Sequence, residues 1–202
     1  QTLQQLFKSQ NYLTAGFGKI EHTSHQNDEL ANYTPGYRVR HRDPDYVTHA
    51  EKDLWKQVIP GTLRLPDHDY LPTRFGMLPD NWDAEDSTRL TEDTETANRT
   101  RAFLQKQHDQ PFFLTCGFYR PHSERIVPKR YYDLYPLDKV QIPPSYSPGD
   151  LDDVPVAGRW RATKRGTHAS VVKAGLWREY LRSYYAAVSY VDEQIGRVLD
   201  AL

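Results

Sequence analysis

The sequence predicts an α/β fold in which helices flank part of a mainly parallel sheet. Three stretches support this prediction. Residues 111–122, PFFLTCGFYRPH, begin with a short aromatic-rich apolar run typical of a strand, and residues 91–107 before them have the pattern of a helix. Residues 2–17 repeat the same order of helix, turn and strand. Because a helix, a tight turn and an apolar strand form half of a βαβ unit, two such units predict parallel strands.

The strand within residues 111–122 is expected to be buried on both faces. Its apolar residues form a nearly continuous run, as they do in strands of two-sided sheets. Pro121 cannot donate to a strand ladder, so pairing should end near it. His122 then lies just past the carboxyl end of the strand. Ligands of open α/β sheets bind at that edge.

The first helix–strand unit ends in polar residues in the same way. Residues 2–9 have apolar side chains at helical spacing, and residues 12–17 form the predicted strand. Lys19 and His22 follow this strand directly. If the two strands are parallel neighbours, Lys19, His22 and His122 gather at one edge of the sheet.

Two longer helices are predicted in the second half of the chain and just before its middle strand, at residues 175–202 and 91–107. The helix at 91–107 begins at Thr91, which suits an N-cap, and its first turn is acidic. The helix at 175–202 has apolar residues in steps of four and three, and this stripe is expected to face the core. A coiled coil is the alternative, although Gly196 favours close packing on a sheet. Residues 23–90 and 123–172 are predicted to be rich in loops, with a short helix within PKRYYDLYPL.

Composition excludes several classes of protein. The net charge is −1 and no basic block stands out, so nothing indicates nucleic-acid binding. No apolar run is long enough to span a membrane. The single cysteine, Cys116, rules out an internal disulfide, and we expect it to be a buried apolar residue, not a nucleophile. Because the chain begins at Gln1 inside a predicted helix, we expect it to be an internal piece of a longer protein.

The polar residues at the strand ends suit the chemistry of an oxyanion ester. Lys19, with Arg120 nearby, would stabilise developing negative charge. A histidine such as His122 can protonate a leaving oxygen. The opposing interpretation is a surface lysine and histidines in solvated turns. Residues 159–165 carry four Arg or Lys residues, which form either a solvated loop or a clamp for an anionic substrate. No P-loop, serine elbow or metal-ligand spacing is present.

Three motifs together resemble the sulfatase family of the alkaline phosphatase superfamily, in particular its iduronate-2-sulfatase-like branch. They are GFGKIEH at 16–22, PFFLTCGFYRPH with VPKRYYDLYPLDKVQIPP at 127–144, and YYAAVSYVDEQIGRVLDAL at 184–202. The resemblance covers most of the chain in order and is weakest across 30–85. It implies an incomplete alkaline phosphatase-like fold, with residues 1–202 as the central part of a single sulfatase catalytic domain.

The resemblance also implies roles for the strand-end residues. Lys19 matches the lysine that contacts the sulfate and the formylglycine nucleophile, and His22 matches the histidine that supports that nucleophile. His122 matches the histidine that contacts the sulfate near the leaving oxygen. The calcium ion and the formylglycine that the family implies have their residues outside this chain. Cys116 is followed by Gly-Phe-Tyr-Arg and does not fit the Cys/Ser-x-Pro-x-Arg motif.

We therefore expect the intact parent to be a sulfuric ester hydrolase acting on a sulfated small molecule or glycan, and the isolated chain to be inactive. The family implies an extracytoplasmic location, whether periplasmic, secreted or lysosomal. Glu21 and Glu124 depart from the branch, which often has an aromatic residue and a proline there. One alternative is a phosphodiesterase or phosphonate monoester hydrolase of the same superfamily. The other is a non-catalytic domain that binds sulfated glycans through Lys19, Arg120 and residues 159–165.

Overall fold

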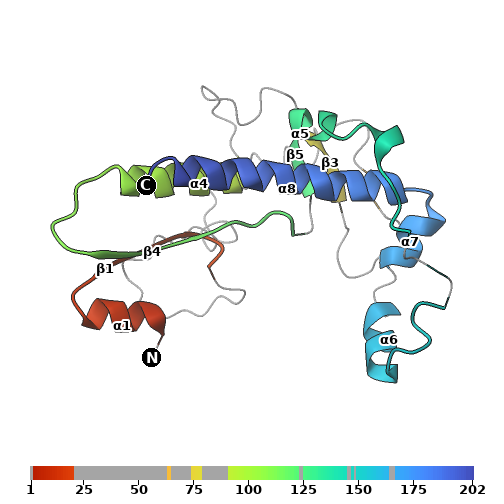
Figure 1. Ribbon diagram of the computed structural model, residues 1–202, viewed down its shortest axis with the longest axis horizontal. Helices are drawn as coiled ribbons and strands as arrows, with labels where there is room; N and C mark the ends of the chain where they lie inside the picture. Colours follow the sequence, from red (N-terminus) through yellow and green to blue (C-terminus); the bar gives the residue numbers. More distant parts are fainter. Residues whose placement is uncertain are drawn as a thin grey trace. The chain divides into compact units, whose positions relative to one another are not determined.

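The computed structural model describes two compact units of the chain (Figure 1). Unit 1 contains the described residues within 1–57, 81–120 and 190–202, and unit 2 those within 58–80 and 121–189. None of the described helices is long and apolar enough to cross a membrane. The structure describes residues 2–20, 63–64, 74–78, 91–122, 125–144, 147, 149–163 and 167–202.

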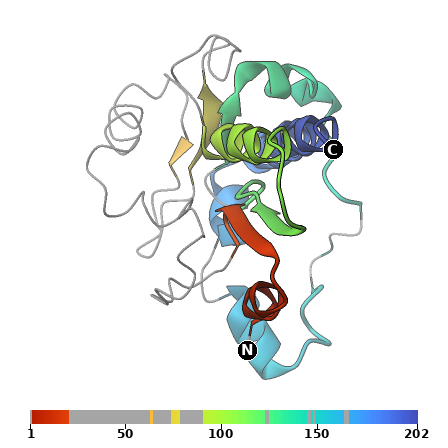
Figure 2. The same ribbon diagram turned by 90° about the vertical axis from the view of Figure 1, so that its left-hand side faces the viewer.

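Unit 1 is built on a pair of parallel strands. Its elements are α1 (Leu3–Ser9), β1 (Leu13–Gly18), α4 (Glu92–Leu104), β4 (Phe112–Gly117) and the second half of α8 (Trp177–Leu199). The pairing runs in register from Leu13 opposite Phe112 to Gly18 opposite Gly117. Helices α1 and α4 lie on opposite sides of this strand pair (Figures 1 and 2). The predicted helix–strand order and the predicted parallel pairing are both confirmed.

Alternating aromatic side chains of β4 contact these two helices. The Phe113 ring stacks on Phe7 of α1, with ring centroids 4.3 Å apart. The neighbouring Phe112 ring meets Phe103 of α4 edge-on at 5.3 Å. Successive residues of a strand point to opposite faces, so one dipeptide joins the strand pair to both helices.

Strand β4 is less buried than the sequence predicted. Phe112 is 38% exposed, and the remaining residues of the strand are half-buried. Strand β1 is the buried one, from Thr14 to Phe17. Among the described residues β4 pairs only with β1, so its other edge has no strand beside it. The apolar run correctly predicted a strand, but the run itself does not indicate how many neighbouring elements bury that strand.

The helix ends follow their local sequence. Thr2 and Gln5 form a capping box at the start of α1, and Asn11 adopts the left-handed conformation (φ 62°) just after that helix ends. Thr91 caps α4 as predicted, because its hydroxyl accepts from the backbone N–H of Thr94 at 3.4 Å.

Unit 2 contains a second small sheet. Its elements are β2 (Leu63–Arg64), β3 (Arg74–Leu78), β5 (Arg125–Pro128), α5 (Lys129–Asp133), the 3-10 helix η2 (Leu137–Lys139), α6 (Val156–Thr163), α7 (Thr167–Lys173) and the first half of α8. β3 pairs in parallel with β5, and β2 pairs antiparallel with β3. Helix α5 confirms the short helix predicted within PKRYYDLYPL.

Two predicted loop regions of unit 2 contain regular structure. Strand β3 lies in the segment expected to be irregular, and α6 and α7 lie in the second segment expected to be loop-rich. Pro155 directly precedes α6, and its carbonyl accepts the first hydrogen bond of that helix, from the Arg159 N–H at 3.0 Å. Proline is tolerated in the first turn of a helix. The predicted basic loop at 159–165 is therefore helical up to residue 163.

Helix α8 turns a different face inward from the one predicted. Residues of the expected apolar stripe are exposed at Tyr184 (42%), Val188 (39%) and Ile195 (41%). The buried face consists mainly of small or hydrogen-bonding residues: Ser183, Ala186, Ala187, Tyr190, Val191 and Gln194. A Cβ added to Gly196 would meet no described atom within 4 Å, so the described residues give no packing reason for this glycine.

Hydrogen bonds in unit 1 explain the rotation of α8. The Tyr190 hydroxyl accepts from the backbone N–H of Thr94 at 3.0 Å and also hydrogen-bonds to Thr91. Arg197 donates to the Asn98 side chain at 2.6 Å. Buried polar groups are costly when they lack partners, so these contacts determine which side of the helix faces α4.

Candidate active site

The carboxyl ends of β1 and β4 meet in close contact. The Lys19 N–H donates to the Gly117 carbonyl at 2.7 Å. A Cβ on Gly117 would lie 1.9 Å from the Lys19 carbonyl oxygen, and one on Gly18 would lie 2.1 Å from the Gly117 oxygen. Gly18 also has a φ of +76°, which favours glycine. These two glycines let both segments leave the sheet side by side.

The residues that follow the two strands come together around one aromatic ring. The Lys19 ammonium lies 4.9 Å from the centroid of the Tyr119 ring, and the Arg120 guanidinium carbon lies 5.5 Å from it. Both distances fit cation–π contacts. Lys19 and Arg120, which was expected nearby, thus lie at one edge of the parallel strand pair.

The two cations differ in their electrostatic partners. Arg120 donates to Glu92 at 3.2 Å and lies 3.7 Å from an oxygen of Asp93, with only 10% of its side chain exposed. Lys19 is half-buried and forms no ion pair within the part of the chain that the structure describes. Arg120 is thus held by carboxylates, while Lys19 is the cation at this edge that suits an anionic ligand.

Asp93, which the sequence did not single out, lies beside this cluster. Its carboxylate is 1% exposed and accepts from the backbone N–H groups of Tyr119 at 2.6 Å and Arg120 at 3.1 Å. The sequence presented it as an acidic residue in the first turn of a helix, which the helix dipole favours on any surface. No signal in the sequence distinguished Asp93 from Glu92 and Glu95, the other acids of the same helical turn, because its partners lie 26 and 27 positions away.

The structure does not describe either predicted histidine relative to this cluster. His22 lies outside the described residues. His122 is exposed in the turn after Arg120 and belongs to unit 2, whereas Lys19 and Arg120 belong to unit 1. The roles assigned to both histidines stay predictions.

Cys116 in β4 has the environment expected of a structural thiol. It is half-buried, and the Thr100 hydroxyl donates to its sulfur at 3.3 Å. Burial is the largest effect and raises the pKa of the Cys116 thiol, and the negative charge of Asp93 raises it further, against the opposing effect of the Thr100 hydrogen bond. The uncharged thiol is therefore the folded form at neutral pH, and it is a poor nucleophile.

We predict that Cys116 in the folded full-length protein reacts with iodoacetamide at pH 8 at least about tenfold more slowly than in urea, since only the thiolate reacts. Peptide mass spectrometry measures the rate at this residue, with Cys116→Ala as the control for its assignment. The pKa of the Cys116 thiol is higher in the folded protein than in the unfolded chain. The thiol therefore stabilises the folded protein fully at pH values below its unfolded pKa, and this stabilisation is lost as the pH rises through its folded pKa. Equal rates in both states would contradict the prediction.

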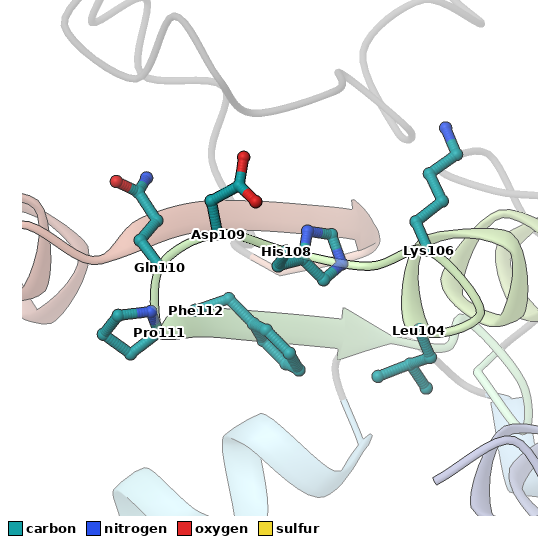
Figure 3. A pocket seen from close by; sticks show the side chains of 7 residues that line it. All are labelled: Leu104, Lys106, His108, Asp109, Gln110, Pro111 and Phe112. Atoms are coloured by element: carbon teal, nitrogen blue, oxygen red, sulfur yellow. The ribbon is translucent and has the colours of Figure 1, made fainter.

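An open hollow lies at the opposite end of the strand pair, where β4 begins (Figure 3). Its lining residues are Leu104, Lys106, His108, Asp109, Gln110, Pro111 and Phe112. The His108 ring stacks on Phe103 at 4.4 Å and its Nε2 lies 2.9 Å from the Phe103 carbonyl, so this histidine serves the packing of the turn. None of the predicted site residues lines this hollow.

Comparison with known proteins decides the family. The sulfatase family model matches residues 1–202. This chain belongs to the sulfatase family. It is 32% identical to a sulfatase of Formosa agariphila across 99% of this chain and 38% of the relative. It is 29% identical to human iduronate 2-sulfatase, across 100% of this chain and 36% of the relative. It is 28% identical to the choline-sulfatase of Rhizobium meliloti, across 79% of this chain and 34% of the relative. The chain spans less than two fifths of the length of these relatives.

Sulfatase membership confirms the predicted family and agrees with the α/β architecture of parallel strands and helices. The family implies a metal ion and a formylglycine nucleophile. The described residues do not fit a metal site, since they include no cluster of three or more His, Cys, Asp or Glu side chains that could hold an ion. The acidic pair Glu92 and Asp93 at the start of α4 is bound to Arg120 and to the backbone.

Proposed function

We propose that the protein containing these 202 residues is a sulfuric ester hydrolase, and that residues 1–202 are the central part of its single catalytic domain. Membership of the sulfatase family supports the reaction class. One structural observation supports the site. Lys19 presents an ammonium group that is not in an ion pair with any described residue, at the carboxyl edge of a parallel strand pair. Ligands of open α/β sheets bind at such edges.

In this proposal Lys19 stabilises negative charge on the sulfate group as the ester bond breaks. The ammonium of a half-buried lysine interacts more strongly with an anion than one in open water, because the local dielectric constant is lower. His122 donates a proton to the leaving oxygen, and His22 supports the nucleophile. The formylglycine nucleophile and a calcium ion, which the family resemblance implies, would be held outside these residues.

We propose a sulfated carbohydrate or another sulfated small molecule as the substrate, in an extracytoplasmic location. Two relatives are named iduronate 2-sulfatase and choline-sulfatase, and these names support a substrate class that includes both sulfated carbohydrates and other sulfated small molecules. Arg120 contributes little to the alternative of glycan binding without turnover, because two carboxylates already hold it. Substrate choice then depends on residues beyond Lys19, such as those near Glu21 and Glu124, where this chain departs from the branch.

The proposal is tested with the purified full-length protein. We expect 4-nitrophenyl sulfate to be hydrolysed faster than 4-nitrophenyl phosphate or bis(4-nitrophenyl) phosphate, and the isolated 202-residue chain to be inactive toward all three. Release of 4-nitrophenol at matched protein concentrations measures the preference. A preference for either phosphate ester selects the phosphodiesterase or phosphonate monoester hydrolase alternative. Salt-sensitive binding of sulfated glycans without any turnover selects the binding domain.

A further inference from the structure

We propose that Asp93 and Tyr119 are positioning residues that hold the Lys19 ammonium at the strand edge. This inference rests on the proposed function of Lys19 and adds the means by which its side chain is kept in place. Neither residue needs to touch the substrate. The three residues come from α4, the turn after β4 and the end of β1, all within unit 1.

Asp93 fixes the backbone of the turn. Its two carboxylate oxygens accept separately from the adjacent N–H groups of Tyr119 and Arg120, at 2.6 and 3.1 Å. Hydrogen bonds to an ionised acceptor are about twice as strong as neutral ones, and here the acceptor is almost completely buried. A buried carboxylate with two neighbouring backbone donors leaves this turn little freedom.

Tyr119 connects the turn that Asp93 fixes to the Lys19 side chain. Its backbone is held by Asp93, and its ring lies under the Lys19 ammonium at 4.9 Å. The backbone of Lys19 is anchored separately through its N–H to Gly117. A lysine side chain loses considerable rotamer freedom when it is held, so an aromatic partner that orders it in advance lowers the cost of binding an anion.

Glu92 and Asp93 also balance the positive charge of Arg120, which lies beside the same Tyr119 ring. Arg120 lies 5.5 Å from the Tyr119 ring, and its guanidinium group is balanced by Glu92 and Asp93. Without that balance a second positive charge beside the ring would repel the Lys19 ammonium. Asp93 therefore acts on Lys19 both through the backbone of the turn and through Arg120.

A double-mutant cycle in the full-length protein tests Asp93. We expect Asp93→Asn to lower kcat/KM for 4-nitrophenyl sulfate about tenfold in the native background and by less than about twofold in Lys19→Ala, because residues that act as a unit are not additive. The asparagine side chain has one acceptor oxygen in place of two, so one of the two backbone N–H groups would face its NH2 group, which cannot accept. Glu95→Gln is the matched control. It removes the same charge from the same helical turn, at a side chain paired with Arg99 at 2.7 Å.

Equal losses from Asp93→Asn in both backgrounds would show a purely structural role and overturn the inference. Normal turnover of Lys19→Ala would instead refute the proposed role of Lys19, so the two failures are distinguishable. If Asp93→Asn does not fold, Tyr119 provides the test. Tyr119→Leu should lower kcat/KM about tenfold, and Tyr119→Phe, which keeps the ring, by less than about threefold. Equal losses in the two Tyr119 variants would also overturn the inference.

Discussion

Replacing Lys19 by alanine in the full-length protein is expected to lower kcat for a sulfate ester on the order of 10²-fold or more. Lys19 is half-buried, and its ammonium group lies against the Tyr119 ring and forms no ion pair with any described residue. Among the described residues, no acidic neighbour offsets its interaction with an anionic transition state. Steady-state kinetics with 4-nitrophenyl sulfate measures the loss.

The control for this experiment is Lys8→Ala, on α1 of the same unit. Lys8 is exposed and lies in the last turn of that helix, so its loss removes the same charge away from the strand edge. We expect its kcat to stay within about twofold of the native value, as for most surface substitutions. Near-normal turnover in Lys19→Ala would reject the assignment of Lys19.

Replacing His122 by alanine is expected to lower kcat by a similar factor, on the order of 10²-fold, for a substrate with a poor leaving group. A general acid matters most when the departing oxygen is strongly basic. The loss should therefore be larger for an alkyl sulfate than for 4-nitrophenyl sulfate, whose leaving group needs little protonation. Comparing kcat across a series of leaving groups measures this difference.

His168→Ala is the matched control, because His168 is another exposed histidine of unit 2 and its ring packs edge-on against Trp177. We expect its kcat to change by less than about twofold. If His122→Ala slows all substrates equally, His122 is not the proton donor. If it slows none of them, it has no part in the reaction.

Local sequence predicted the elements that depend on neighbours along the chain. Helical spacing and the Thr91 cap identified α4, and apolar runs identified β1 and β4. Parallel pairing then followed from the helix–strand order, and it brought Lys19 and Arg120 to one edge as expected. Periodicity and capping are properties of a few consecutive residues, so a single sequence contains them.

Features that depend on distant partners were not predictable in this way. The inward face of α8 depends on the Tyr190 hydroxyl reaching Thr91 and Thr94, and apolar periodicity alone pointed to another face. Asp93 looked like an ordinary acid at a helix start until its backbone partners beyond β4 were known. Burial of β4 was overestimated for the same reason, since it depends on neighbours and not on the run itself.

The register of β1 and β4 also has a consequence for folding kinetics. Leu13 pairs with Phe112, 99 positions later, and Thr94 donates to Tyr190, 96 positions further along. Helices α1, α4 and α8 form from local contacts, whereas closing such long loops costs entropy before any strand contact compensates for it. Lys19 and Tyr119 therefore meet late, after the helices exist. During synthesis on the ribosome, the strand edge that carries Lys19 cannot reach its final support until residue 190 has emerged.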